Sequence, residues 1–147
     1  MTLFLSTFIN KLDKKGRVSV PASFRQCVVK HSFQGIVVFG SYKLPTVEGM
    51  SFERMERLSQ NVDTLDIFSE AQENLTAALF SDTHMLPFDG DGRVLLPKLL
   101  LDHAQITDTV AFVGRGATFR IWNPTLFETY QAKARQLIQD REASQNA

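Results

Sequence analysis

One nine-residue pattern occurs twice in this chain, and it constrains the fold more than any other feature. The segment 13–21, DKKGRVSVP, returns as DGDGRVLLP at 89–97, which lies 76 positions later. The Asp, Gly, Arg, Val and Pro positions are identical, and Asp, Gly and Pro are residue types that control turns. A pattern repeated at half the chain length predicts two copies of one small structural unit.

Each copy predicts a turn that is followed by a strand. An Asp at the first position of a turn can accept hydrogen bonds from backbone N–H groups two or three residues later. A Gly at the fourth position can adopt the positive φ that closes a hairpin through a bulge. A Pro at the ninth position stops the strand ladder and suits the start of a helix. The residues expected to shape the turns are Asp13, Gly16, Pro21, Asp89, Gly92 and Pro97.

The remaining pattern predicts a mainly β protein with helices, of the α+β class. Further strands are expected at 3–12, 35–40, 43–47, 110–114 and 119–122. Helices are expected at 51–60 with Ser51 as the cap, at 66–80, and after a cap at Asn123-Pro124. Each has an apolar stripe that predicts packing against the core. Two of these stripes are long: Phe68, Ala71, Leu75, Ala78 and Leu79, and then Leu126, Phe127, Tyr130, Ala134, Leu137 and Ile138. The last residues, 142–147, are expected to fray.

The size of the chain predicts that the two copies share a core. The chain has 147 residues, and a unit of about 50 residues would be marginally stable alone. The core is therefore shared between the copies or with other chains. Cys27 is the only cysteine, which excludes an internal disulfide, fits a reducing cytoplasm and favours a core position. The sequence indicates neither a signal peptide nor a transmembrane run.

Charge separates the two copies. The formal net charge is zero, but residues 11–30 carry a net charge of +5 while residues 82–103 carry −2. A local cluster of Lys and Arg is typical of a surface that binds a polyanion such as DNA. The candidate DNA-binding residues are Lys11, Lys14, Lys15, Arg17 and Arg93. Arg93 is the weaker candidate because it could pair with Asp89 or Asp91 in its own turn.

The sequence favours neither an enzyme nor a cofactor protein. None of the three histidines stands in a metal-ligand or nucleophile spacing, and we expect neither metal nor cofactor. The run DGDG at 89–92 does not fit a calcium loop, because Arg93 and Leu100 occupy positions that require oxygen ligands. A phosphate-binding glycine loop is also absent.

Both copies of the repeated pattern resemble motifs of the MraZ family. Residues 13–25 are similar to the first motif of that family, and residues 89–97 are similar to the second. The segment FRIWNP at 119–124 resembles the junction between the last strand and last helix of the family. One such motif alone would indicate only the wider AbrB/SpoVT superfamily.

The resemblance implies a double swapped-hairpin, AbrB-like β-barrel built from two pseudo-symmetric repeats and assembled into ring-shaped homo-oligomers. The implied units are 7–54 and 83–130, with connecting helices at 55–82 and a helix end and tail at 131–147. It further implies a sequence-specific regulator in the cytoplasm and nucleoid that binds double-stranded DNA. The implied targets are direct repeats upstream of its own division and cell-wall gene cluster, which such proteins usually repress. The DNA-contacting arginine of the family corresponds to Arg17, and its equivalent in the second copy is Arg93.

The chain departs from the family pattern in its middle helix, and one alternative function stays open. The family usually has arginines before the second motif, whereas residues 66–79 contain none and include Glu70 and Glu73. The alternative is a protein-interaction module of the AbrB-like antitoxin type. The amphipathic last helix disfavours it, because antitoxins usually have a disordered tail that wraps a partner.

Overall fold

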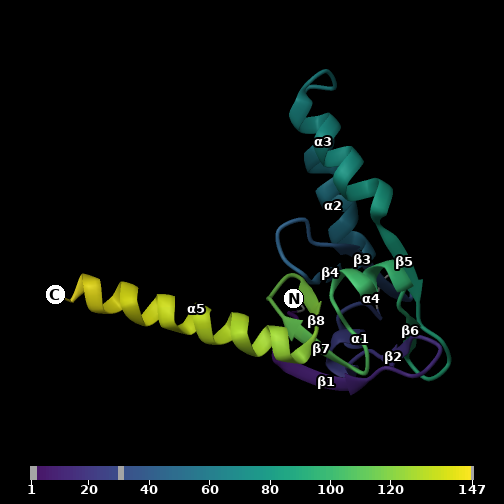
Figure 1. Cartoon of the computed structure of the whole chain (residues 1–147). Helices are drawn as coiled ribbons and strands as arrows, with labels where there is room; N and C mark the ends of the chain where they lie inside the picture. Colours follow the sequence, from purple (N-terminus) through teal and green to yellow (C-terminus); the bar gives the residue numbers. More distant parts are fainter. Residues whose placement is uncertain (1–2, 30–31, 147) are drawn as a thin grey trace.

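The structure is a computed structural model that describes residues 3–29 and 32–146. Figure 1 shows a body of strands and short helices from which a helical hairpin and a long C-terminal helix project in different directions. In chain order the elements are β1 (Thr7–Lys11), β2 (Arg17–Ser19), α1 (Ala22–Gln26), β3 (Gly35–Gly40), β4 (Val47–Met50), α2 (Phe52–Asp63), α3 (Glu70–Leu79), a 3-10 turn (Phe80–Asp82), β5 (His84–Pro87), β6 (Arg93–Leu95), α4 (Lys98–His103), β7 (Thr109–Gly114), β8 (Phe119–Trp122) and α5 (Pro124–Gln145).

The strands form one antiparallel sheet of six and one antiparallel ribbon of two. The order in the large sheet is β1-β7-β8-β4-β3-β5, and the ribbon consists of β2 and β6. The expected mixture of strands and helices is therefore confirmed. The large sheet is open over the described residues, with β1 and β5 at its edges, where the resemblance implied a barrel.

The edge strands of the large sheet pair across the two copies of the repeated pattern. The strand just before the first pattern, β1, pairs with β7, which follows the second pattern, and Lys11 lies opposite Thr109. The strand just before the second pattern, β5, pairs with β3, which follows the first pattern, and Pro87 lies opposite Gly35. Each edge strand of the large sheet therefore pairs with a strand that follows the other occurrence of the pattern.

The ribbon and the centre of the large sheet join equivalent strands of the two copies. In the ribbon Val18 lies opposite Val94, each at the middle of its strand. In the large sheet β4 pairs with β8, and Glu48 lies opposite Arg120. Arg120 Nε donates to Glu48 Oε1 over 2.8 Å, and both side chains are largely buried. These pairings tie the two copies together at two positions.

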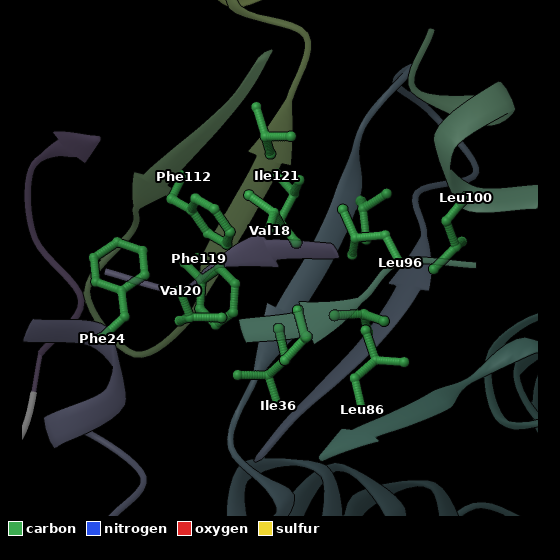
Figure 2. Close-up of a cluster of buried hydrophobic side chains, with 14 of the residues drawn as sticks. Val18, Val20, Phe24, Ile36, Leu86, Leu96, Leu100, Phe112, Phe119 and Ile121 are labelled. Carbon is green, nitrogen blue, oxygen red and sulfur yellow. The ribbon is translucent and has the colours of Figure 1, made fainter. Parts of the chain in front are cut away.

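Apolar side chains of both copies fill the space between the ribbon and the large sheet. Val18 and Val94 are each 1% exposed, and a single buried cluster includes them together with side chains of β3, β7 and β8. Figure 2 shows Val18 and Val20 lying among side chains of the large sheet such as Ile36 and Phe119. The expectation of a shared core is confirmed. Buried Cys27 also belongs to this cluster.

The expected strand at 43–47 is wrong by several residues, since the strand β4 runs from Val47 to Met50. A local loop occupies the preceding residues. The hydroxyl of Ser41 accepts from the backbone N–H groups of Lys43 and Leu44, each over 3.3 Å. The N–H of Ser41 also donates to the carbonyl of Thr46. Backbone groups that bond within a loop are unavailable to a ladder, so the strand begins only after it.

The two middle helices form a hairpin that leaves the body (Figure 1). Ser51 caps α2 by accepting from the N–H of Arg54, as expected, and Ser69 caps α3 in the same way. The expectation that α3 packs its apolar stripe in the core is wrong. Phe68 before the helix is 89% exposed, and α3 has no buried residue. Only its end, Leu79, packs against the small core cluster under α2.

The C-terminal helix α5 also differs from its expected packing. Asn123 caps it by accepting from the N–H groups of Thr125 and Leu126, as expected. Of the expected apolar face only Phe127 is buried, while Leu137 and Ile138 are 58% and 57% exposed. The helix continues to Gln145, so the frayed end expected at 142–147 is wrong up to that residue. None of the helices in the described ranges is long and apolar enough to cross a membrane.

We expect the substitution Phe24→Ala to be among the most destabilising in the chain. Phe24 is 0% exposed, and its ring centroid lies 5.2 Å from those of both Phe4 and Phe119. Loss of a buried phenyl ring leaves a cavity and costs about 3–5 kcal/mol of unfolding free energy. Urea denaturation at one protein concentration measures the change.

The matched control is Gln26→Ala, on the exposed side of the same short helix. We expect it to change the unfolding free energy by about 0.5 kcal/mol or less. A loss below about 1 kcal/mol for Phe24→Ala would contradict its place in the core.

Candidate nucleic-acid interface

The first turn, residues 13–17, is organised by the carboxylate of Asp13. Its Oδ1 accepts from the backbone N–H groups of Lys15 (2.9 Å) and Arg17 (2.8 Å). Its Oδ2 accepts from Arg17 Nε over 2.7 Å. The N–H of Asp13 donates to the carbonyl of Arg17, and Gly16 has a φ of +89°. One aspartate therefore shapes the backbone and orients the arginine side chain.

The second turn, residues 89–93, repeats these contacts. Asp89 Oδ1 accepts from the N–H groups of Asp91 and Arg93, each over 2.9 Å, and Oδ2 accepts from Arg93 Nε over 2.9 Å. The φ of Gly92 is +74°. One contact has no counterpart in the first turn, since Arg93 Nη2 lies 3.3 Å from Asp91 Oδ2.

The ribbon brings the two arginines to one face. Arg17 lies opposite Leu95, and Ser19 lies opposite Arg93. Since side chains alternate along a strand, these four side chains share one face, while Val18 points to the core from the other. Arg17 and Arg93 are diagonal neighbours, at a separation that long side chains can span. We call the face formed by Arg17, Ser19, Arg93 and Leu95 the outward face of the ribbon.

The lysines surround only one end of this face. Lys14 and Lys15 are exposed at the tip of the first turn, and exposed Lys11 ends β1 two residues before it. Because β2 and β6 are antiparallel and each follows its own turn, the two turns lie at opposite ends of the ribbon. The candidate cations are therefore grouped at the first turn, with Arg93 on the same face toward the second.

The hydrogen bonds of the first turn favour the ionised form of Asp13. The backbone N–H of Arg17 is the largest influence, and the guanidinium of Arg17 and the N–H of Lys15 act in the same direction. Partial desolvation opposes them, and the result lowers the pKa of Asp13 from its ordinary value to about 2. The corresponding bonds, led by the N–H of Arg93, lower the pKa of Asp89.

The prolines of the two motifs begin short helices behind the turns. Pro21 has a φ of −52° and precedes α1, and Pro97 has a φ of −59° and precedes α4. Arg25 of α1 donates to the carbonyl of Val20 and lies against the second turn, where it would clash with a Cβ on Gly92.

Sequence reasoning counted Arg25 as charge but missed this position, and it also missed that Ser19 and Leu95 lie on the outward face. Alternation along β2 could have placed Ser19 beside Arg17. The contact of Arg25 with the second turn has no local signal, because it depends on packing between the two copies.

The histidines and acidic side chains of the described residues do not gather into a metal-binding cluster. Within the ranges 3–29 and 32–146 no group of three or more His, Cys, Asp or Glu side chains could hold a metal ion. His103 Nε2 lies 3.2 Å from the carbonyl of Leu44, so this histidine joins the end of α4 to the loop before β4. The outward face instead groups two arginines near the exposed lysines of the first turn, and such side chains can contact anions.

Comparison with known proteins gives consistent results. The family model described as "MraZ protein, putative antitoxin-like" matches residues 79–146. The Transcriptional regulator MraZ of Rickettsia bellii (strain OSU 85-389) is 42% identical over 142 residues, which cover 96% of this chain and 95% of the relative. That of Pelagibacter ubique (strain HTCC1062) is 42% identical over 133 residues, covering 90% and 86%. That of Rickettsia akari (strain Hartford) is 38% identical over 141 residues, covering 96% and 95%.

We expect the Asp13 carboxyl to titrate near pH 2 in the folded protein, because the native turn bonds its charged form. A lowered pKa stabilises the fold fully above the ordinary pKa of about 4. This contribution is lost as the pH falls from about 4 through about 2. Carbon-13 NMR of the side-chain carboxyl measures the midpoint directly.

The variant Arg17→Ala separates the effect of the side-chain donor on the pKa of Asp13 from the effect of the backbone donors. It removes the Nε donor but keeps the two backbone donors, so the midpoint should rise only part of the way to the ordinary value. A midpoint near 4 in the unchanged protein would contradict the hydrogen bonding of the first turn.

Proposed function

The chain belongs to the MraZ family, and we propose that it is a transcriptional regulator that binds double-stranded DNA through the first turn and the outward face of the ribbon. The observation that carries this proposal is the geometry of Arg17. Asp13 holds its Nε, so the Nη atoms remain for a phosphate or a guanine edge. An arginine that is already oriented loses less side-chain entropy when it binds.

Three lysines support the same role. Lys14 and Lys15 are exposed in the same turn as Arg17, and Lys11 is exposed two residues before that turn. Lysine supplies a compact positive charge to phosphates. Phosphate contacts set the affinity and position of a DNA-binding protein, whereas base contacts set its sequence preference. We assign the phosphate contacts to these lysines and a phosphate or base contact to Arg17, with Arg93 as a weaker contributor.

We further propose that the protein assembles into ring-shaped homo-oligomers. Each protomer would contain two swapped-hairpin units, 7–54 and 83–130, with connecting helices at 55–82 and a terminal segment at 131–147. The pairing of β1 with β7 and of β5 with β3 supports the exchange of strands between the units. The exposed apolar side chains Leu137 and Ile138 on α5 support contacts between copies. Several weak cationic turns in one assembly would gain avidity that a chain of zero net charge lacks.

The proposed targets are direct repeats upstream of the protein's own division and cell-wall gene cluster, bound in the cytoplasm and nucleoid to repress transcription. The support for these targets is family membership. In the proposed ring, successive turns would meet successive DNA repeats. We expect no enzymatic activity, in keeping with relatives that are named transcriptional regulators.

One observation favours a second candidate, a protein-interaction module of the AbrB-like antitoxin type. The description of the matching family model contains the word antitoxin-like. Against it, residues 124–145 form the helix α5 rather than an extended segment. A small partner protein that co-purifies in a constant ratio would favour this candidate.

We expect Arg17→Ala to weaken binding to duplex DNA from the protein's own upstream region by about tenfold or more. One arginine contact to DNA contributes about 1–3 kcal/mol, and avidity in an oligomer multiplies the loss. A gel shift measures the affinity, and light scattering should give the same multiple of 16.6 kDa for both proteins. The control is Arg57→Ala, at an exposed position of α2, which removes the same charge. Unchanged binding by Arg17→Ala would refute the proposed function.

We expect charge reversal of both turn lysines, Lys14→Glu with Lys15→Glu, to flatten the salt dependence of DNA binding. Each lost phosphate contact lowers the slope of log K against log salt by about 0.9, so the double variant should lose about 2. Affinities measured from about 50 to 200 mM salt provide the slope. The same slope in both proteins would show that these lysines do not contact phosphates.

A further inference from the structure

The two turns have the same backbone but opposite charge. Both are held by an Asp at the first position and a Gly with positive φ at the fourth. Lys15 of the first turn corresponds to Asp91 of the second, and Lys14 corresponds to Gly90. Counting their charged side chains, the first turn carries +2 and the second carries −1.

The difference in charge changes the surroundings of the arginines. Among the described residues, the guanidinium of Arg17 has one carboxylate partner, Asp13, at its Nε. The guanidinium of Arg93 has two, because Asp89 Oδ2 is 2.9 Å from its Nε and Asp91 Oδ2 is 3.3 Å from its Nη2. A phosphate that approaches Arg93 must compete with Asp91 for Nη2 and also meets the negative charge of that side chain.

Asp91 lies beside the surface that would face DNA. Arg93 shares the outward face with Arg17, and Asp91 lies two residues before Arg93. We propose that Asp91 is a positioning residue, which neutralises Arg93 and so directs the phosphate backbone of DNA to the first turn. This inference rests on the proposed function. It makes each protomer an asymmetric DNA-binding element although its two turns share one geometry.

The shape of the second turn does not require Asp91. Its side chain is 79% exposed. The bonds that shape the turn come from the carboxylate of Asp89 and from backbone groups, including the N–H of Asp91 itself. The first turn also shows that a lysine fits the equivalent position, Lys15, without loss of the same bonds. Substitution of Asp91 should therefore change the charge and leave the fold intact.

The test is fluorescence anisotropy with a labelled duplex from the protein's own upstream region, at about 0.1 M salt. We expect Asp91→Asn to bind about three- to tenfold more tightly than the unchanged protein, since one cation becomes available to phosphate. The slope of log K against log salt should steepen by about 1. Asp91→Lys, which copies the first turn, should produce a larger gain. Lys15→Asp, which copies the second turn, should weaken binding.

Two further variants test whether the gain in affinity comes from Asp91 acting on Arg93. Asp63→Asn removes the same charge from an exposed position at the end of α2, away from the ribbon in Figure 1, and should leave binding unchanged. In the double variant Asp91→Asn with Arg93→Ala, the gain should disappear, because the freed cation is absent.

The outcomes separate this inference from the proposed function. If Arg17→Ala abolishes binding but Asp91→Asn produces no gain, the role of Asp91 is refuted and the proposed function stands. A gain that persists without Arg93 would also refute it, because Asp91 would then act by simple repulsion. If Arg17→Ala binds as tightly as the unchanged protein, the proposed function itself fails.

Discussion

The pairing of β2 with β6 joins the two repeated motifs through three residues of each strand. Its inner face places Val18 and Val94 at the centre of a core that draws side chains from both copies. Its outer face carries Arg17 and Arg93 as diagonal neighbours. One short ladder therefore contributes to the hydrophobic stability of the chain and also creates its candidate binding surface. Neither copy could do this alone, because each supplies only one of the two strands.

The aspartates of the turns orient the arginines that this ladder carries. Asp13 and Asp89 each bond two backbone N–H groups and the Nε of an arginine. The same carboxylate therefore sets the start of the strand and the direction of the guanidinium. The proposed difference in DNA binding between the turns does not come from this shared frame. It comes from the neighbouring position, which is occupied by Lys15 in one turn and by Asp91 in the other.

The sequence predicted the elements more successfully than their surroundings. The strand Phe119–Trp122 and the caps Ser51 and Asn123 were predictable, because alternation and capping are local properties. The family assignment, confirmed by relatives at 38–42% identity, also followed from local motifs. The apolar stripes on α3 and α5 were predicted to pack in the core, but they do so only at one end, through Leu79 of α3 and through Leu126 and Phe127 of α5. An amphipathic pattern marks the apolar face of a helix but does not say what covers it.

The sequence by itself determined the two turns, since Asp, Gly and Pro act on the backbone within a few residues. It also determined the unequal charge of the two motifs. Only the tertiary structure decided which strands pair, that the two arginines lie on one face, and that Arg25 of α1 packs against the second turn. The physical reason is the separation along the sequence of the residues that interact. Turn and capping bonds form between near neighbours, whereas the pairing of Val18 with Val94 depends on core packing that residues distant in the sequence provide together.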